Sequence, residues 1–204
     1  MHTLLTTIQG IDESVLATVN GWVGHSAVFD LVLTVCAKWL VYAIPLVLVV
    51  AWFWVKFGPG ARKAVEQRVD LVMLTIAGLA SWQGLDRIIK LFYFRPRPWV
   101  TGQHVKELFF HRPDQSFPSD HAAFLFGLAT FSYLLGWRKT GTVALTVAVL
   151  VSAARVITGT HWLSDIIGGL VVGAIGAWII WLFRVPLERY IVRPLVKFAT
   201  NLGL

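Results

Sequence analysis

The chain has 204 residues, of which 56% are hydrophobic and 14% are charged, and its formal net charge is +7. Soluble domains carry about 25% charged residues, so this composition, with a mean hydropathy of +0.68, indicates an integral membrane protein. Cys36 is the one cysteine, which excludes an intrachain disulfide and argues against a cysteine-based metal cage.

The first segment, residues 1–24, carries apolar side chains at helical spacing. A helix with one apolar face suits a membrane surface, so this segment is expected to lie along the interface. An ordinary frayed terminus is the alternative. The apolar positions are Ile8, Ile11, Val15, Val19 and Trp22.

Five apolar stretches follow. A bilayer-spanning helix needs roughly 20 apolar residues, fewer where polar ends reach the headgroups. The stretches are Leu31–Val55, Leu71–Phe94, Ala122–Trp137, Val143–Ile157 and Ile166–Phe183. The sequence therefore predicts an all-α, polytopic membrane bundle of about five transmembrane helices, and residues 1–204 are expected to form a single membrane-embedded domain.

The basic residues are distributed unevenly between the two ends of these spans. Ten of the eighteen fall on one side: Lys56, Arg62, Lys63, Arg68, Arg138, Lys139, Arg184, Arg189, Arg193 and Lys197. The positive-inside rule makes that side cytoplasmic. A multi-pass protein of the cell membrane is expected, with residues 185–204 as a cytoplasmic tail. The N-terminus, the loop over residues 94–118 and the turn near His161 would then face outward. The positive charge thus reports topology, and no nucleic-acid partner is expected.

Lys90, Arg95 and Arg97 form the first of three polar clusters, at the end of the second span. Cations at the edge of a hydrocarbon core cost free energy unless something negative needs them there. Prolines 96 and 98 disfavour helix in the residues before them, so both arginines should lie where the span stops. A stop-transfer flank or snorkelling side chains are the alternative, which the outward position weakens.

Phe117–His121 is the second cluster, directly before the third span. Pro118 followed by Ser119 or Asp120 predicts a helix start, with either side chain able to cap it. The free amides at a helix start suit a bound phosphate, and His121 would lie at the edge of that phosphate-binding site.

Arg155–Asp165 is the third cluster. His161 and Asp165 are four residues apart and share one face if a helix begins near His161. A carboxylate beside an imidazole fixes its tautomer and raises its basicity, as a nucleophilic or basic histidine requires.

The predicted topology brings the three clusters to one face of the membrane. Their permanent cations suit a phosphoryl group with several equatorial oxygens, and two histidines suit a nucleophile and a separate acid. No carboxylate cluster typical of a metal pair occurs, so the cations are expected to take the place of Mg²⁺, with no metal and no cofactor.

The spacing of these clusters resembles the three signature motifs of the type 2 phosphatidic acid phosphatase superfamily, which includes vanadium haloperoxidases and glucose-6-phosphatase. The matching patterns are Lys90-x6-Arg97-Pro98, Pro118-Ser119-x-His121 and Arg155-x5-His161-x3-Asp165. The resemblance implies that His161 is a nucleophile that forms a phosphohistidine, that Asp165 orients it, and that His121 protonates the leaving oxygen. The phosphate ligands that it implies are Lys90, Arg97, Ser119 and Arg155, with backbone amides near Asp120. Arg95 has no place in the motifs, and a second phosphate or headgroup contact is one hypothesis for it.

Two positions depart from the motifs. Asp120 stands where glycine is usual, and Ala154 stands where serine is usual before Arg155. A carboxylate beside a phosphate would repel it unless it is turned away or paired, for which Arg95 and Lys106 are candidates. The PSDH variant in a short five-span chain is similar to the bacitracin-resistance type of undecaprenyl-diphosphate phosphatase.

The resemblance implies hydrolysis of undecaprenyl diphosphate to undecaprenyl phosphate, which recycles a carrier of cell-wall synthesis. The expected partners are a polyprenyl diphosphate lipid and the bilayer, and the sequence leaves a homo-oligomer open. A phosphatase for phosphatidylglycerophosphate, phosphatidate or lipid A is the first alternative. A non-catalytic protein that binds or transports anionic lipid is the second, and vanadate-dependent peroxidation is the third.

Overall fold

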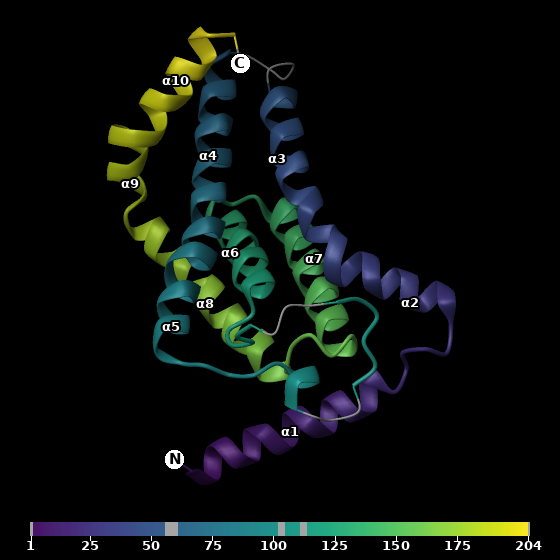
Figure 1. The fold of residues 1–204 in the computed structure, drawn as a ribbon. Coiled ribbons are helices and arrows are strands. Elements are labelled where there is room, and N and C mark those ends of the chain that lie inside the picture. The colour runs from purple at the N-terminus through teal and green to yellow at the C-terminus, as the bar shows by residue number, and fades with distance from the viewer. Residues whose placement is uncertain (1, 56–60, 102–104, 111–113, 204) are drawn as a thin grey trace.

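The computed structural model describes residues 2–55, 61–101, 105–110 and 114–203, and every regular element within those ranges is helical (Figure 1). The predicted all-α class is therefore confirmed. Lys56 and parts of the expected outer loop, residues 102–104 and 111–113, lie outside the described residues.

Ten α-helices follow one another along the described chain. They are α1 (His2–Asn20), α2 (Ala27–Thr34), α3 (Ala43–Trp54), α4 (Ala61–Leu79), α5 (Arg87–Phe92), α6 (Asp120–Leu134), α7 (Arg138–Ile157), α8 (Leu163–Leu182), α9 (Arg184–Leu187) and α10 (Arg193–Asn201). Short π-helical or 3-10 segments are Val35–Trp39, Leu40–Tyr42, Ala80–Asp86, Pro98–Thr101 and Glu188–Val192. They make α2–α3 and α4–α5 two long, nearly continuous rods (Figure 1).

The five predicted spans correspond to the two rods and to α6, α7 and α8. Among the residues that the structure describes, three helical stretches are long and apolar enough to cross a membrane: Ala27–Trp54, Arg138–Ile157 and Leu163–Leu182. Helix α6 has only 15 residues, and it ends where Gly136 adopts a left-handed backbone conformation, with φ +77°.

Helix α6 lies at the centre of the bundle, between α4, α7 and α8. Most of its side chains are buried, as expected of a helix that is apolar on all sides. Glycines of α8 allow a close approach: a Cβ added at Gly169 would lie 2.6 Å from the Cβ of Ala122, and one at Gly173 would lie 2.7 Å from the carbonyl oxygen of Ala123. This contact fixes the start of α6 against the start of α8, where the second and third motifs lie.

Helix α1 lies across the end of the bundle where α6 and α8 begin (Figure 1). It contacts α7 and α8. Of its predicted apolar positions, Val15 and Val19 pack against the core, whereas Ile8, Ile11 and Trp22 are exposed. The helix therefore has one face on the protein and leaves some of its apolar side chains exposed. Its position on a membrane surface stays a prediction.

Candidate active site

The predicted site residues meet at the end of the bundle that α1 covers. They lie in α5 (Lys90), in the loop after it (Arg97), at the start of α6 (Ser119, Asp120 and His121), at the end of α7 (Arg155), and around the start of α8 (His161 and Asp165). Three clusters that are separate in the sequence thus form one continuous set of contacts.

His161 is fully buried, and its two ring nitrogens face different partners. Nδ1 lies 3.0 Å from the carbonyl oxygen of Ser116. Nε2 lies 3.1 Å from Arg97 Nη1 and 3.2 Å from Arg155 Nη2. Because guanidinium groups only donate, Nε2 is the acceptor, and Nδ1 carries the proton that it donates to Ser116. The neutral tautomer thus presents its Nε2 lone pair between two cations.

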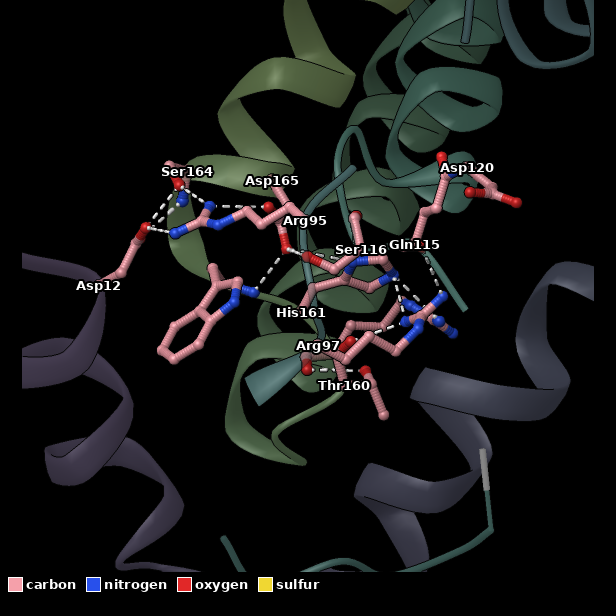
Figure 2. Close-up of polar contacts among 12 residues, drawn as sticks. Asp12, Arg95, Arg97, Gln115, Ser116, Asp120, Thr160, His161, Ser164 and Asp165 are labelled. Carbon is pink, nitrogen blue, oxygen red and sulfur yellow. Dashed lines mark hydrogen bonds and ion pairs between the residues drawn. The ribbon is translucent and has the colours of Figure 1, made fainter. Parts of the chain in front are cut away.

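Asp165 supports His161 less directly than its spacing predicts. Its Oδ2 lies 3.5 Å from His161 Nδ1, but it accepts shorter hydrogen bonds from Ser116 Oγ, at 2.7 Å, and from the Trp162 N–H, at 2.9 Å. Arg95 donates to the other oxygen at 2.9 Å. Figure 2 shows this arrangement, with Ser116 between the carboxylate and the imidazole. Ser116 therefore shares the orienting role, and no motif spacing pointed to it.

Two buried guanidinium groups close the other side of His161. Arg97 donates through Nε to Asp114, at 2.5 Å, and through Nη1 to the Thr160 carbonyl, at 2.7 Å. Arg155 donates through Nη1 to the Ala37 carbonyl, at 2.9 Å. These contacts hold both cations beside Nε2, where an anion would neutralise them.

Lys90 is engaged by two carboxylates. Its Nζ pairs with Asp86 Oδ2 at 2.9 Å, and it also donates to Asp120. The predicted partners of Asp120 are therefore wrong, because Lys106 instead donates to the Val23 carbonyl at 2.9 Å and Arg95 lies on the far side of Asp165. Neither of the two candidate cations meets this carboxylate; its partner is Lys90, a residue of the first motif.

Asp120 occupies the first position of α6, and its side chain is 28% exposed. Burial raises the pKa of its carboxyl, but the ammonium of Lys90 and its hydrogen bond, with His121 and the helix-start backbone, outweigh burial and hold that pKa below its usual value. Asp120 is thus ionised at neutral pH and neutralises part of the Lys90 charge.

Ser119 precedes α6 in an extended conformation, but its side chain does not form the predicted cap. Its backbone N–H donates to the Asp165 carbonyl at 3.1 Å. Its buried hydroxyl has no hydrogen-bond partner among the described residues. A buried polar atom without a partner is costly, so this hydroxyl is available to a ligand oxygen.

His121 joins the polar site to an apolar groove. Its Nε2 lies 3.5 Å from Nη1 of Arg155. Because Nη2 of the same arginine contacts His161, one guanidinium group lies between the two histidines. Asp120 and His121 line the polar end of a cavity of about 650 Å³. Its walls are apolar side chains of α3, α4 and α6, among them Leu48, Trp52, Val72 and Phe124.

A second, polar cavity of about 510 Å³ lies beside Lys90. Its lining includes Gln83, Arg87, Lys90, Asp114 and Gln115. Within the described ranges, no three His, Cys, Asp or Glu side chains are grouped as a metal ion would require. Arg87 and Lys90 supply positive charge to the lining of this cavity.

The structure thus places one buried histidine, one partly buried histidine and three cations at one end of an apolar helical bundle, as the three motifs predict. The chain belongs to the PAP2 superfamily, whose match covers residues 71–189. This family is the one that the three motifs resemble, and it confirms that resemblance. Helix α1 and the α2–α3 rod precede the matched segment.

Two bacterial relatives match most of the chain. BcrC of Bacillus subtilis strain 168, named an undecaprenyl-diphosphatase, is 27% identical over 181 residues, which cover 89% of this chain and 88% of BcrC. YbjG of Escherichia coli K12 is 30% identical over 185 residues, which cover 85% of this chain and 84% of YbjG.

Two crystal structures share the fold. LpxE of Aquifex aeolicus superposes with a TM-score of 0.63 at 22% identity, over 82% of this chain and 93% of LpxE. A transmembrane PAP2-type phosphatidylglycerolphosphate phosphatase of Bacillus subtilis superposes with a TM-score of 0.62 at 21% identity, over 90% and 89%. The fold is thus that of transmembrane PAP2 phosphatases.

Proposed function

We propose that the protein hydrolyses undecaprenyl diphosphate to undecaprenyl phosphate and inorganic phosphate at the outer side of the cell membrane. The observation that carries this proposal is the apolar groove, which ends at Asp120 and His121 beside the buried His161. A lipid with a long apolar tail and a phosphorylated head fits such a groove, with its tail between α3 and α4. The name of BcrC, an undecaprenyl-diphosphatase, supports this substrate.

The chemistry would proceed in two displacements. His161 Nε2 attacks the terminal phosphorus and forms a P–N bond, while the P–O bond to the bridging oxygen breaks. His121 gives its proton to that oxygen, which leaves as undecaprenyl phosphate. Water then attacks the phosphohistidine and gives a proton to His121, and inorganic phosphate leaves. His121 thus ends the cycle protonated, as it began.

Charge on the equatorial oxygens would be stabilised by groups already aimed at Nε2. Arg97 and Arg155 lie 3.1 and 3.2 Å from that atom, so they are within reach of oxygens on a phosphorus bonded to it. The Ser119 hydroxyl and the amides at the start of α6 would complete the phosphate-binding site. Lys90 would join after exchanging Asp120 for a phosphate oxygen. The polar cavity beside Lys90 has room for the second phosphate.

The outward orientation follows from the uneven distribution of basic residues. Arg184 and Arg193 lie near the ends of the spans opposite the site, and the positive-inside rule makes that end cytoplasmic. A site on the outer face would act on the lipid diphosphate left after its cargo has been transferred. Protection of single cysteines placed at either end, in inverted and right-side-out vesicles, tests this orientation.

Phosphate release by purified protein in detergent tests the activity. Undecaprenyl diphosphate would be compared with phosphatidate, phosphatidylglycerophosphate and lipid A 1-diphosphate, each with EDTA. His161→Gln is the matched inactive variant, because glutamine keeps an acceptor for Arg97 and Arg155 but offers no nucleophile. Preferred release from the prenyl lipid, absent in His161→Gln, supports the proposal.

Other outcomes separate the remaining hypotheses. Preferred release from a glycerolipid or from lipid A would keep the phosphatase chemistry and replace the substrate. No release from any lipid, with retained binding of substrate, would favour the non-catalytic lipid-binding function. Bromide oxidation after addition of vanadate would favour the haloperoxidase function.

A further inference from the structure

Helix α1 contributes a buried carboxylate to the edge of the site. Asp12 is 2% exposed, although it lies near the N-terminus and outside the segment that matches the superfamily. Its Oδ1 accepts the Ser164 N–H at 2.9 Å, and its Oδ2 accepts Ser164 Oγ at 2.5 Å and Arg95 Nη2 at 2.7 Å. Burial of a carboxylate is costly, so these contacts must compensate for it.

Arg95 joins this carboxylate to Asp165. One nitrogen, Nη2, donates to Asp12, and the other, Nη1, donates to Asp165 Oδ1 at 2.9 Å and to Ser164 Oγ at 2.6 Å. The guanidinium lies over the Trp162 ring, 5.3 Å from its centroid. Figure 2 shows Arg95 between the two carboxylates. The hypothesis that Arg95 contacts a phosphate or headgroup is therefore not supported by its position.

We propose that Asp12 is a positioning residue, which acts through Arg95 on Asp165 and thereby on His161. The proposal rests on the phosphatase activity proposed above. It makes α1 part of the machinery that sets the nucleophile, although neither α1 nor Arg95 belongs to a motif.

Two physical effects transmit the influence of Asp12. The first is geometric: Asp12 holds both the N–H and the hydroxyl of Ser164, next to the residue that supports His161, so it fixes the first turn of α8. The second is electrostatic, because one guanidinium serves two buried carboxylates. Without the Asp12 charge, Arg95 would keep its neutral partners Gln9 and Ser164, but Asp165 would face its cation without a competing carboxylate and would stabilise positive charge on His161 less well.

A purely structural clamp is the competing explanation. In that case loss of Asp12 would release α1 and lower the fraction of competent protein, but each competent molecule would react at the normal rate. Single-turnover phosphate release with enzyme in excess separates the two, because its rate constant at saturation does not depend on the inactive fraction.

Asp12→Asn is the main variant, since asparagine keeps the size and an acceptor but removes the charge. With undecaprenyl diphosphate, its single-turnover rate constant is expected to fall by up to about 100-fold, as misplaced reacting groups cause. Asp30→Asn is the matched control. Asp30 also accepts a backbone N–H near the outer end of the bundle, that of Gly24, but has no contact with Arg95. Its rate constant should equal that of the wild type.

A double-mutant cycle tests the route through Asp165. In an Asp165→Asn background, Asp12→Asn should cause little further loss, because the residue through which it acts is already changed. If the two substitutions lowered the rate constant by independent factors that multiply in the double variant, the proposed route through Asp165 would be overturned. Asp12→Glu should recover much of the rate, because it restores the anion beside Arg95.

The outcomes also separate this proposal from the one on which it rests. Absence of phosphate release by the wild type would overturn the proposed activity itself. An active wild type with an equally fast Asp12→Asn variant would overturn only the role of Asp12. If Asp12→Asn does not fold, Arg95→Lys replaces it: lysine keeps the charge but loses the fork that spans both carboxylates, and a normal single-turnover rate would contradict the proposal.

Discussion

The two sides of the site differ in how deeply their charged groups are buried. On the His161 side, the imidazole, Asp165 and Arg97 are buried and held by several hydrogen bonds each. On the groove side, Lys90 faces Asp120, whose side chain is 28% exposed. One side is thus preorganised for chemistry, and the other is arranged so that a ligand can exchange with a carboxylate.

This difference matches the demands of each side. Groups that stabilise a transition state work best when they need no reorganisation, and burial strengthens their electrostatic effect. A group that admits and releases a charged lipid head must let go of it, and an ion pair whose carboxylate is partly exposed is easier to break than a fully buried one. Asp120 therefore serves as a replaceable partner of Lys90 while the substrate is absent.

Arg155→Lys should give the largest change, because Arg155 links the two sides. Its fork reaches both His121 and His161, and an ammonium would reach one of them. We expect kcat to fall by about 10²- to 10³-fold, as for loss of one oxyanion donor. Phosphate release measures this, with Arg184→Lys at the opposite end of the bundle as the control. A loss of less than a few-fold would show that the link is unnecessary.

Thr75→Trp should weaken binding of the lipid tail in the apolar groove without changing the His161 side of the site. Thr75 lies in its wall on α4, and an indole there would displace about 50–60 Å² of apolar lipid contact, which is worth roughly 1.4 kcal/mol. The kcat/KM for undecaprenyl diphosphate should fall about ten-fold, with little change for a five-carbon prenyl diphosphate.

Thr146→Trp is the control for the groove substitution. Thr146 lies exposed on α7, and its hydroxyl donates to the carbonyl four residues earlier, as that of Thr75 does. An equal loss for long and short substrates in Thr75→Trp would mean that the groove does not hold the tail.

The sequence was sufficient to predict the helical bundle and the meeting of the three motifs at one end of it. Apolar length predicts spans without tertiary information, and topology then places Lys90, His121 and His161 at one end. The helix start at Asp120 also followed from local signals, since proline and short polar side chains mark such starts.

The supporting contacts were not predictable, because they depend on how segments pack. Asp12 meets Arg95 across 83 residues, and no spacing rule connects α1 to α8. Ser116 has no motif position, yet its carbonyl determines the tautomer of His161. Asp120 had several candidate cations in the sequence, and only the fold shows that Lys90 is the one it meets.

Asp120→Asn should have the opposite effect to the groove substitution, because it should make substrate binding on the groove side easier. Substrate would no longer compete with a carboxylate for Lys90, so KM for undecaprenyl diphosphate should fall by up to about five-fold, with kcat little changed. Asp120→Glu keeps the charge and should keep KM near that of the wild type. A higher KM in Asp120→Asn would mean that the carboxylate helps to bind substrate.

The smallest expected effect is a pH dependence of stability that belongs to the same ion pair. The folded pKa of Asp120 lies below its ordinary value of about 3.9, so the ionised carboxylate stabilises the folded protein above that pH. This stabilisation should be lost as the pH falls below about 4 and through the folded pKa, when the carboxylate takes up a proton and releases Lys90.

Unfolding midpoints of the wild type and Asp120→Asn, measured from pH 3 to pH 7 in one detergent, should therefore differ by a constant amount above about pH 5 and converge in acid. The difference should correspond to no more than about 1 kcal/mol, because the carboxylate is partly exposed. A difference that grew on acidification would mean that the pKa is raised on folding, and Asp120 could then not be the ionised partner that the groove side requires.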